Sequence, residues 1–129
     1  MRGTILIVDD TESSVAALEI ALDGMAGAQV AFVPSAVEAV RSLQDEGRAI
    51  WAVVTDIRMP TMDGFDLIRF IRADSAHSGI PIIVVTADTD PDTPERISRL
   101  GANAFFAKPF SPGAVRKTLE KLLHGNDKT

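Results

Sequence analysis

The stretch Trp51-Ala52-Val53-Val54-Thr55-Asp56-Ile57-Arg58-Met59-Pro60 decides the fold that we expect for this chain. It is a short apolar run, rich in β-branched residues, that reaches a carboxylate and then breaks at a proline. Such a run predicts a strand that is buried on both faces of a parallel sheet. Because ligands bind outside the carboxyl ends of the strands in open parallel sheets, we expect Asp56 to lie in a cleft.

Further apolar and β-branched runs predict more strands, and apolar residues at helical spacing follow each of them. The expected strands are residues 4–8, 29–33, 50–55, 80–85 and 104–107. The expected helix starts are Thr11 or Ser13, Ser35, Asp63-Gly64, Thr93-Pro94 and Ser111-Pro112, and the expected glycine stops are Gly24, Gly47 and Gly101. Since parallel strands need crossover connections, this alternation predicts an α/β fold with a doubly wound parallel sheet.

Length and composition indicate one globular domain. The chain has 129 residues, of which 46% are hydrophobic and 24% charged, and this balance disfavours a disordered chain. We expect a single domain over residues 1–124 and a polar, frayed tail over residues 125–129.

Charge and cysteine content exclude several classes of protein. The net charge is −5 and no basic stripe is present, so direct binding of nucleic acid is not expected. The absence of cysteine excludes disulfides and thiolate metal sites. The sequence has neither a signal peptide nor an apolar run long enough to cross a membrane, so we expect a cytoplasmic protein without a membrane partner.

Polar residues stand at the carboxyl ends of four expected strands. They are Asp9, Asp10, Asp56, Thr86 and Lys108. If the first, third and fifth strands are neighbours, three carboxylates and one ammonium share a small cleft. Two carboxylates about 4 Å apart repel by about 4 kcal/mol at an effective dielectric of about 20, so such a cluster either raises a pKa or recruits a cation. An all-oxygen set of ligands suits Mg²⁺.

These groups are suited to phosphoryl transfer onto a carboxylate. Lys108 supplies a positive point charge for a phosphoryl oxygen, and the hydroxyl of Thr86 can donate to another. Asp56 is then the covalent nucleophile, and catalysis comes mainly from positioning and charge neutralisation.

Five motifs occur in order along the chain: Ile7-Val8-Asp9-Asp10, Asp56 with Met59-Pro60, Met62-Asp63-Gly64, Val84-Val85-Thr86-Ala87, and Gly101-Ala102-Asn103 leading to Lys108-Pro109-Phe110. Taken together, they resemble the receiver domain of two-component response regulators and follow that family's order from Thr4 to about Leu123. The resemblance implies a flavodoxin-like fold of five strand–helix units with the strand order 2-1-3-4-5.

The resemblance also implies a role for each residue of the site. Asp56 is the expected phosphoacceptor, Asp10 the main carboxylate ligand of Mg²⁺, and Asp9 a ligand acting largely through water. The backbone carbonyl of Arg58 is expected to complete the protein ligands of the metal. Lys108 is expected to bind the phosphoryl group, and the Lys108-Pro109 bond is expected to be cis.

A conformational switch is a further implication of the resemblance. Phosphorylation is expected to draw Thr86 toward Asp56 and to turn the aromatic ring at position 105 inward, which changes the face formed by helix four, strand five and helix five. The ring here belongs to Phe105, which lacks the hydroxyl of a tyrosine, so its contribution is restricted to packing.

Two positions tune the lifetime of the phosphoryl group in such domains, and here they are Arg58 and Asp88. Our hypothesis is that Arg58 pairs with Asp88 across the mouth of the site and hinders the attacking water. Unchanged dephosphorylation rates in both Arg58→Ala and Asp88→Ala would end this hypothesis.

The predicted function is a phosphorylation-controlled signalling switch of a two-component phosphorelay that uses Mg²⁺. The expected partners are a histidine kinase or histidine phosphotransfer protein and an unidentified downstream protein, with homodimerisation through the helix 4–strand 5–helix 5 face as a further option. The domain is expected to catalyse its own phosphorylation and dephosphorylation without being a turnover enzyme.

Three alternatives stay open. The first is an interaction module that signals without phosphate. The second is a Mg²⁺-dependent phosphohydrolase of the haloacid-dehalogenase type, which Arg58 disfavours because such enzymes carry a second Asp at that position. The third is a fragment of a larger regulator or hybrid kinase, whereas the initial Met and the polar tail favour a complete protein.

Overall fold

The structure is a computed structural model that describes residues 3–25 and 27–125. The strands are β1 (Gly3–Val8), β2 (Ala28–Val33), β3 (Ile50–Thr55), β4 (Ile82–Thr86) and β5 (Ala104–Ala107). The helices are α1 (Glu12–Leu22), α2 (Ala36–Gln44), α3 (Gly64–Ala73), α4 (Thr93–Leu100) and α5 (Pro112–Gly125).

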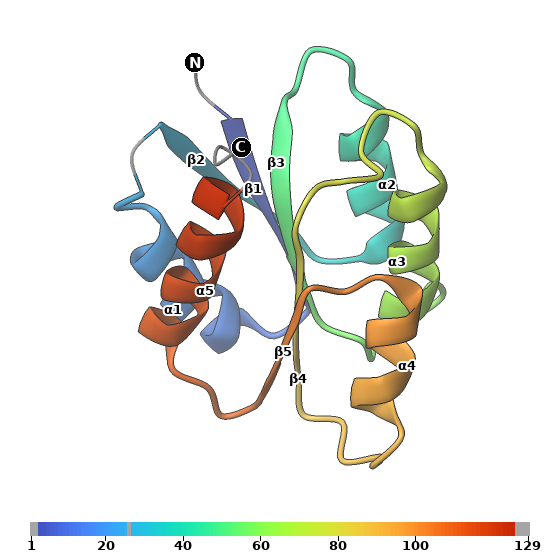
Figure 1. Cartoon of the computed structure of the whole chain (residues 1–129). Coiled ribbons are helices and arrows are strands. Elements are labelled where there is room, and N and C mark those ends of the chain that lie inside the picture. Colours follow the sequence, from blue (N-terminus) through green and yellow to red (C-terminus); the bar gives the residue numbers. More distant parts are fainter. Residues whose placement is uncertain (1–2, 26, 126–129) are drawn as a thin grey trace.

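The strands form one five-stranded sheet in the order β2-β1-β3-β4-β5, and every neighbouring pair is parallel. Helices α1 and α5 cover one face of the sheet, and α2, α3 and α4 cover the other (Figure 1). The predicted flavodoxin-like α/β fold and its strand order are therefore confirmed.

The sheet separates two apolar cores, and the central strands serve both of them. Leu6 and Val8 of β1 pack beneath α2, α3 and α4, whereas Ile5 and Ile7 pack beneath α1 and α5. Each of these side chains is fully buried, which stabilises the fold by roughly 1.5–3 kcal/mol per residue. The two-residue period of a strand thus explains the continuous apolar runs in the sequence.

Polar residues determine several helix starts as expected. Ser35 accepts a hydrogen bond from the Glu38 amide, and Asp63 accepts one from the Asp66 amide. Ser111 likewise accepts a hydrogen bond from the Ala114 amide. These three N-caps satisfy amides that the first turn of a helix leaves without an intrahelical partner.

One expected helix start is settled by the structure and another differs from it. Helix α1 has Thr11 at its N-cap, one of the two expected candidates, although the Thr11 side chain makes no capping hydrogen bond. Helix α4 has Asp92 at its N-cap, and Thr93 is already its first helical residue. The Thr93 hydroxyl is instead directed to a loop carboxylate, and this interaction outweighs its expected capping role.

The expected glycine stops are right only for α4. Gly101 has a φ of 110°, in the left-handed region that favours glycine. Helix α2 ends at Gln44 with Asp45 as its C-cap, before Gly47. Helix α1 ends at a right-handed Asp23.

The end of α1 is completed by a residue from the other end of the chain. Arg116 of α5 donates hydrogen bonds to the carbonyl oxygens of Ala21 (3.2 Å) and Gly24 (3.1 Å). The Ala21 carbonyl is one of those that the last turn of a helix leaves without an intrahelical partner, and Gly24 lies two residues beyond the end of α1. A long-range guanidinium contact therefore closes α1 without a left-handed glycine at position 24.

Strand β4 and helix α5 have bounds that differ from the expected ones. β4 begins at Ile82, two residues after the expected start, and Pro81 lies just before it and accepts a bond from the Val53 amide. Helix α5 includes Gly125, and the rest of the tail expected to be frayed lies outside the described residues. No helix in the described ranges is long and apolar enough to span a membrane.

Candidate functional site

The register of the sheet brings two acidic strand ends together. Val8 of β1 is the partner of Thr55 of β3, so Asp9 and Asp56 leave the sheet side by side. Asp9 is fully buried, Asp56 is 6% exposed, and Asp10 is exposed. One carboxylate oxygen from each of the three lies within 4.8 Å of the others. The convergence expected from the sequence is therefore present.

Lys108 follows β5 and connects two of these carboxylates. Its Nζ lies 3.0 Å from Asp9 Oδ2 and 3.0 Å from Asp56 Oδ2. Burial by itself lowers the pKa of Lys108, but hydrogen bonds and charge attraction from the two carboxylates outweigh burial and raise this pKa above its ordinary value. The ammonium is therefore a fixed positive charge at neutral pH.

Backbone groups orient the Asp56 carboxylate. Its Oδ1 accepts hydrogen bonds from the amides of Ile57 (2.6 Å) and Arg58 (3.4 Å), while Oδ2 faces Lys108. Gly64 packs directly behind this turn, because a Cβ there would lie 2.4 Å from the Asp56 carbonyl oxygen. The Asp63-Gly64 pair thus allows the start of α3 to pack closely against the loop after β3.

Thr86 lies at the carboxyl end of β4 and is fully buried. Its Oγ1 accepts a hydrogen bond of 3.2 Å from the Asp88 amide. Because a hydroxyl has one hydrogen to donate besides its acceptor sites, Thr86 can still donate toward an oxygen in the cleft.

The hypothesised pair between Arg58 and Asp88 is present. Arg58 Nη2 lies 2.8 Å from Asp88 Oδ2, and the two side chains are 63% and 6% exposed. The Asp90 amide, assisted by Thr93 and Arg58, holds the pKa of Asp88 below its ordinary value despite burial. The pairing of Arg58 with Asp88 is thereby confirmed, whereas its place across the mouth of the site and its effect on phosphoryl lifetime stay predictions.

The contact of Thr93 with this pair was missed at the sequence level. The dipeptide Thr93-Pro94 is typical of an N-cap followed by proline, and this pattern concealed the other use of the hydroxyl. Thr93 Oγ1 donates to Asp88 Oδ2 at 3.0 Å. The sequence did offer one signal for this contact, because Asp88 is close in sequence to a Thr at the start of a helix.

Phe105 lies in β5 and is half-buried. Its side chain packs against the core beneath α2, α3 and α4. The expected switch role of Phe105 stays a prediction. The Lys108-Pro109 bond is cis, as the family resemblance implied.

The donor set fits a hard divalent cation. Asp9, Asp10 and Asp56 offer carboxylate oxygens within ligating reach of one another, and such ligands suit Mg²⁺. The backbone carbonyl of Arg58 is the fourth expected protein ligand. Lys108 offsets part of the negative charge, which leaves this edge of the sheet with an excess of carboxylates.

Comparisons with known proteins point to one family. The family model described as "Response regulator receiver domain" matches residues 5–120. The chain is 31% identical to the chemotaxis protein CheY1 of Helicobacter pylori over 95% of this chain and 98% of that relative. It is 35% identical to the DNA-binding response regulator MtrA of Mycobacterium leprae, covering 98% of this chain but 54% of the relative.

A solved structure gives the same result. A response regulator receiver protein from Pseudomonas putida is 33% identical, with a TM-score of 0.83 over 94% of this chain and 98% of that protein. The chain therefore belongs to the response regulator receiver domain family of two-component signalling.

Proposed function

We propose that the chain is a phosphorylation-controlled signalling switch in which Asp56 accepts a phosphoryl group in the presence of Mg²⁺. The observation that supports this most strongly is the cluster of Asp9, Asp10 and Asp56 with Lys108 bonded to two of the three carboxylates. An excess of like charge destabilises a protein core, whereas carboxylates in close proximity are the ligands that a divalent cation needs beside a phosphoryl group.

Family membership supports the choice of partners. Receiver domains are signalling proteins that interact with histidine kinases or phosphotransfer proteins, and they are not turnover enzymes. We propose that such a partner supplies the phosphoryl group to Asp56 and that both proteins meet in the cytoplasm. The downstream partner is a protein whose affinity differs between the two phosphorylation states.

In the proposed transfer, a carboxylate oxygen of Asp56 forms a bond to phosphorus while the phosphorus–nitrogen bond of a phosphohistidine breaks. The imidazole nitrogen leaves with the electron pair of that bond. Lys108 stabilises the negative phosphoryl oxygens, and the backbone amides at positions 57 and 58 keep the carboxylate oriented. Bound Mg²⁺ would be held by Asp9, Asp10, Asp56 and the Arg58 carbonyl and would supply charge neutralisation.

The proposed output depends on Thr86 and Phe105. The Thr86 hydroxyl would donate to a phosphoryl oxygen, and the resulting movement of β4 would make room for Phe105 to turn inward. The α4–β5–α5 face would then change shape for a partner or for a second copy of the chain. Substitution of Phe105 by alanine would remove this response and leave phosphorylation of Asp56 intact.

The deciding experiment is intact-protein mass spectrometry after incubation with Mg²⁺ and acetyl phosphate. We expect the parent to gain one phosphoryl group and the Asp56→Asn variant to gain none. Omitting Mg²⁺ should abolish the gain in the parent. No gain in the parent with acetyl phosphate or with a panel of phosphorylated histidine kinases would contradict the proposal and favour a module that signals without phosphate.

A further inference from the structure

We propose that Thr93, the first residue of α4, is a positioning residue that fixes Asp88 and, through it, the Arg58 guanidinium across the mouth of the phosphoacceptor site. In this position Arg58 hinders water and prolongs phosphorylation. The effect on lifetime depends on the proposed function, because it concerns loss of a phosphoryl group from Asp56.

Thr93 and Arg58 both donate hydrogen bonds to the same carboxylate oxygen, Asp88 Oδ2. Thr93 Oγ1 donates to Asp88 Oδ2 at 3.0 Å, and Arg58 Nη2 donates to the same oxygen at 2.8 Å. Thr93 is fully buried and the Asp88 side chain is 6% exposed. The oxygen that receives Arg58 is therefore held from the protein interior by a hydroxyl whose own position is fixed by packing.

The second oxygen of Asp88 is also occupied. Asp88 Oδ1 accepts the Asp90 amide at 2.9 Å, and the Asp88 amide donates to Thr86 Oγ1 at 3.2 Å. Asp90 in turn accepts the Asp92 amide at 2.9 Å. Successive hydrogen bonds thus connect Thr86 to the start of α4, and the Thr93 hydroxyl bonds back to Asp88.

Helix capping does not account for the Thr93 contact. Asp92 occupies the N-cap position of α4, with φ −85° and ψ −13°, and Thr93 is inside the helix. A Thr at that position can leave its hydroxyl in solvent or bond it within the helix. Here the hydroxyl reaches back to a residue two positions after Thr86, so the contact serves the loop and the site.

A fixed anchor matters because the Arg58 side chain is 63% exposed. An exposed ion pair on its own contributes little and constrains a long side chain weakly. A bond to a buried, otherwise saturated carboxylate restricts the guanidinium to one place. Since β3 and β4 are neighbours, the pair spans the loops on both sides of the cleft.

The position of the pair bears on hydrolysis. In that reaction a water oxygen forms a bond to phosphorus, the phosphorus–oxygen bond to Asp56 breaks, inorganic phosphate leaves, and the proton from water passes to solvent. The attacking and leaving oxygens are roughly in line, so water must approach from the side opposite the carboxylate. Because Arg58 follows Asp56 by two positions and its guanidinium is bonded to the loop after β4, we expect the guanidinium to obstruct that approach.

The first test measures loss of phosphate from phosphorylated variants in Mg²⁺. We expect Thr93→Val, which keeps the shape and removes the hydroxyl, to lose phosphate roughly threefold to tenfold faster than the parent. Thr93→Ser, which restores the hydroxyl, should fall within about twofold of the parent. The neighbouring Asp92→Ala is the matched control for the start of α4 and should resemble the parent.

A double-variant cycle separates positioning from general damage to α4. If Thr93 acts through Arg58, Thr93→Val should cause no further acceleration in an Arg58→Ala background. A parent-like rate for Thr93→Val, or an equal acceleration with and without Arg58, would overturn the inference.

A second measurement does not need phosphate. The ¹⁵N NMR signals of the Arg58 guanidinium should show slow rotation and protection in the parent and in Thr93→Ser, and both should be lost in Thr93→Val. If the parent takes up no phosphoryl group, the proposed function fails, and these signals alone decide the positioning role. Unchanged Arg58 signals in Thr93→Val would overturn it.

Discussion

The two edges of the sheet differ in how their charged side chains are paired. At the carboxyl edge, Asp9, Asp10 and Asp56 crowd together with Lys108 as their bonded cation. At the amino edge of β4 and β5, one guanidinium, that of Arg72, is surrounded by neutral acceptors. The first arrangement leaves an excess of carboxylates that could hold a cation, and in the second every N–H of the guanidinium donates a hydrogen bond within the protein.

Arg72 of α3 connects three segments of the chain. It donates to the Gly101 carbonyl from Nε (3.0 Å) and Nη2 (2.7 Å), and to the carbonyls of Ser78 (2.8 Å) and Ile80 (2.7 Å) from Nη1. It also reaches Asn103 Oδ1 at 3.0 Å. Burial lowers the pKa of Arg72 from its ordinary value, yet a guanidinium stays charged at any pH of interest.

Backbone conformation shows the same contrast. Within the described ranges, the positive-φ residues at the amino edge are Gly27 (78°) and Gly101 (110°). At the carboxyl edge, the loop between β3 and α3 places Thr61 at a φ of 71°. Glycine thus avoids backbone strain at the amino edge, whereas the non-glycine Thr61 keeps a positive φ in the loop that follows Asp56.

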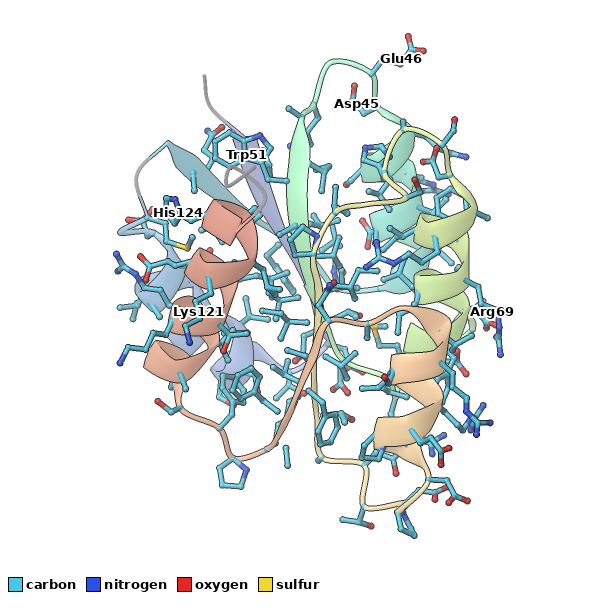
Figure 2. All side chains as sticks on the ribbon, viewed as in Figure 1. Asp45, Glu46, Trp51, Arg69, Lys121 and His124 are labelled. Carbon is cyan, nitrogen blue, oxygen red and sulfur yellow. The ribbon has the colours of Figure 1, made fainter. Side chains whose placement is uncertain are left out.

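The largest effect on the free energy of unfolding should follow from removing the guanidinium at the amino edge. Arg72→Ala leaves four part-buried or exposed acceptors without their charged donor, and we expect a loss of about 3 kcal/mol in the free energy of unfolding, measured by urea denaturation. Arg69 on the outer side of α3 (Figure 2) supplies the control, because Arg69→Ala removes an exposed ion pair with Asp66 and should cost at most about 0.5 kcal/mol. Equal losses in the two variants would contradict the contrast.

Relieving the carboxyl edge should have a smaller effect of opposite sign. Asp56→Asn removes one of three crowded charges and keeps an oxygen for the Ile57 amide, so we expect a gain of about 1 kcal/mol in the free energy of unfolding in EDTA. Added Mg²⁺ should then stabilise the parent more than the variant. The exposed Asp66→Asn change should leave both values nearly unaltered, and a destabilised Asp56→Asn variant would show that Asp56 is net stabilising in the apo protein.

A still smaller gain is expected from the strained loop. Thr61→Gly removes the Cβ penalty at a φ of 71°, and after the entropy cost of glycine we expect a gain of about 0.5–1 kcal/mol, read as a rise in the thermal midpoint. Thr61→Ala keeps the Cβ and should gain nothing. A gain in stability from both substitutions would show that the effect comes from loss of the hydroxyl and methyl groups and not from relief of strain.

The smallest effect concerns alkaline pH. The pKa of Lys108 is raised in the folded protein, so its contribution to stability is complete below the unfolded value of about 10.4 and is lost as pH rises through the higher folded value. Unfolding free energy should therefore decline above that pH less steeply in Lys108→Met than in the parent. Lys121, which projects from α5 into solvent (Figure 2), gives the control variant Lys121→Met with a parent-like decline. Equal slopes in all three proteins would contradict the raised pKa.

Local and periodic features made the fold predictable from the sequence. The central strand at 50–55 and the last strand at 104–107 were placed at their observed bounds, because apolar runs between turn residues leave few alternatives. The helix caps at Ser35, Asp63 and Ser111 were also correct, since each cap depends on residues within one turn. The strand order came from the resemblance to a family and was confirmed by the sheet.

Long-range contacts limited the prediction. Nothing near Arg72 or Arg116 in the sequence indicates that each will bond to carbonyls in other segments, so their roles were missed. Asn103 was noticed only as part of a family motif. In the structure its amide oxygen accepts from the Ile82 amide and from Arg72, which aligns the starts of β4 and β5. The Asp cluster was predicted because the carboxyl ends of parallel strands converge at one edge of the sheet. The contact of Thr93 with Asp88 became apparent only in the structure.

The contact between Lys108 and Asp9 spans 99 positions of sequence. A ribosome therefore finishes the acidic half of the site long before it adds the lysine that offsets it. Until that residue emerges, the nascent chain carries these carboxylates without their bonded cation. If Asp56 accepts a phosphoryl group as proposed, a chain released before position 108 would lack the lysine that is bonded to the acceptor.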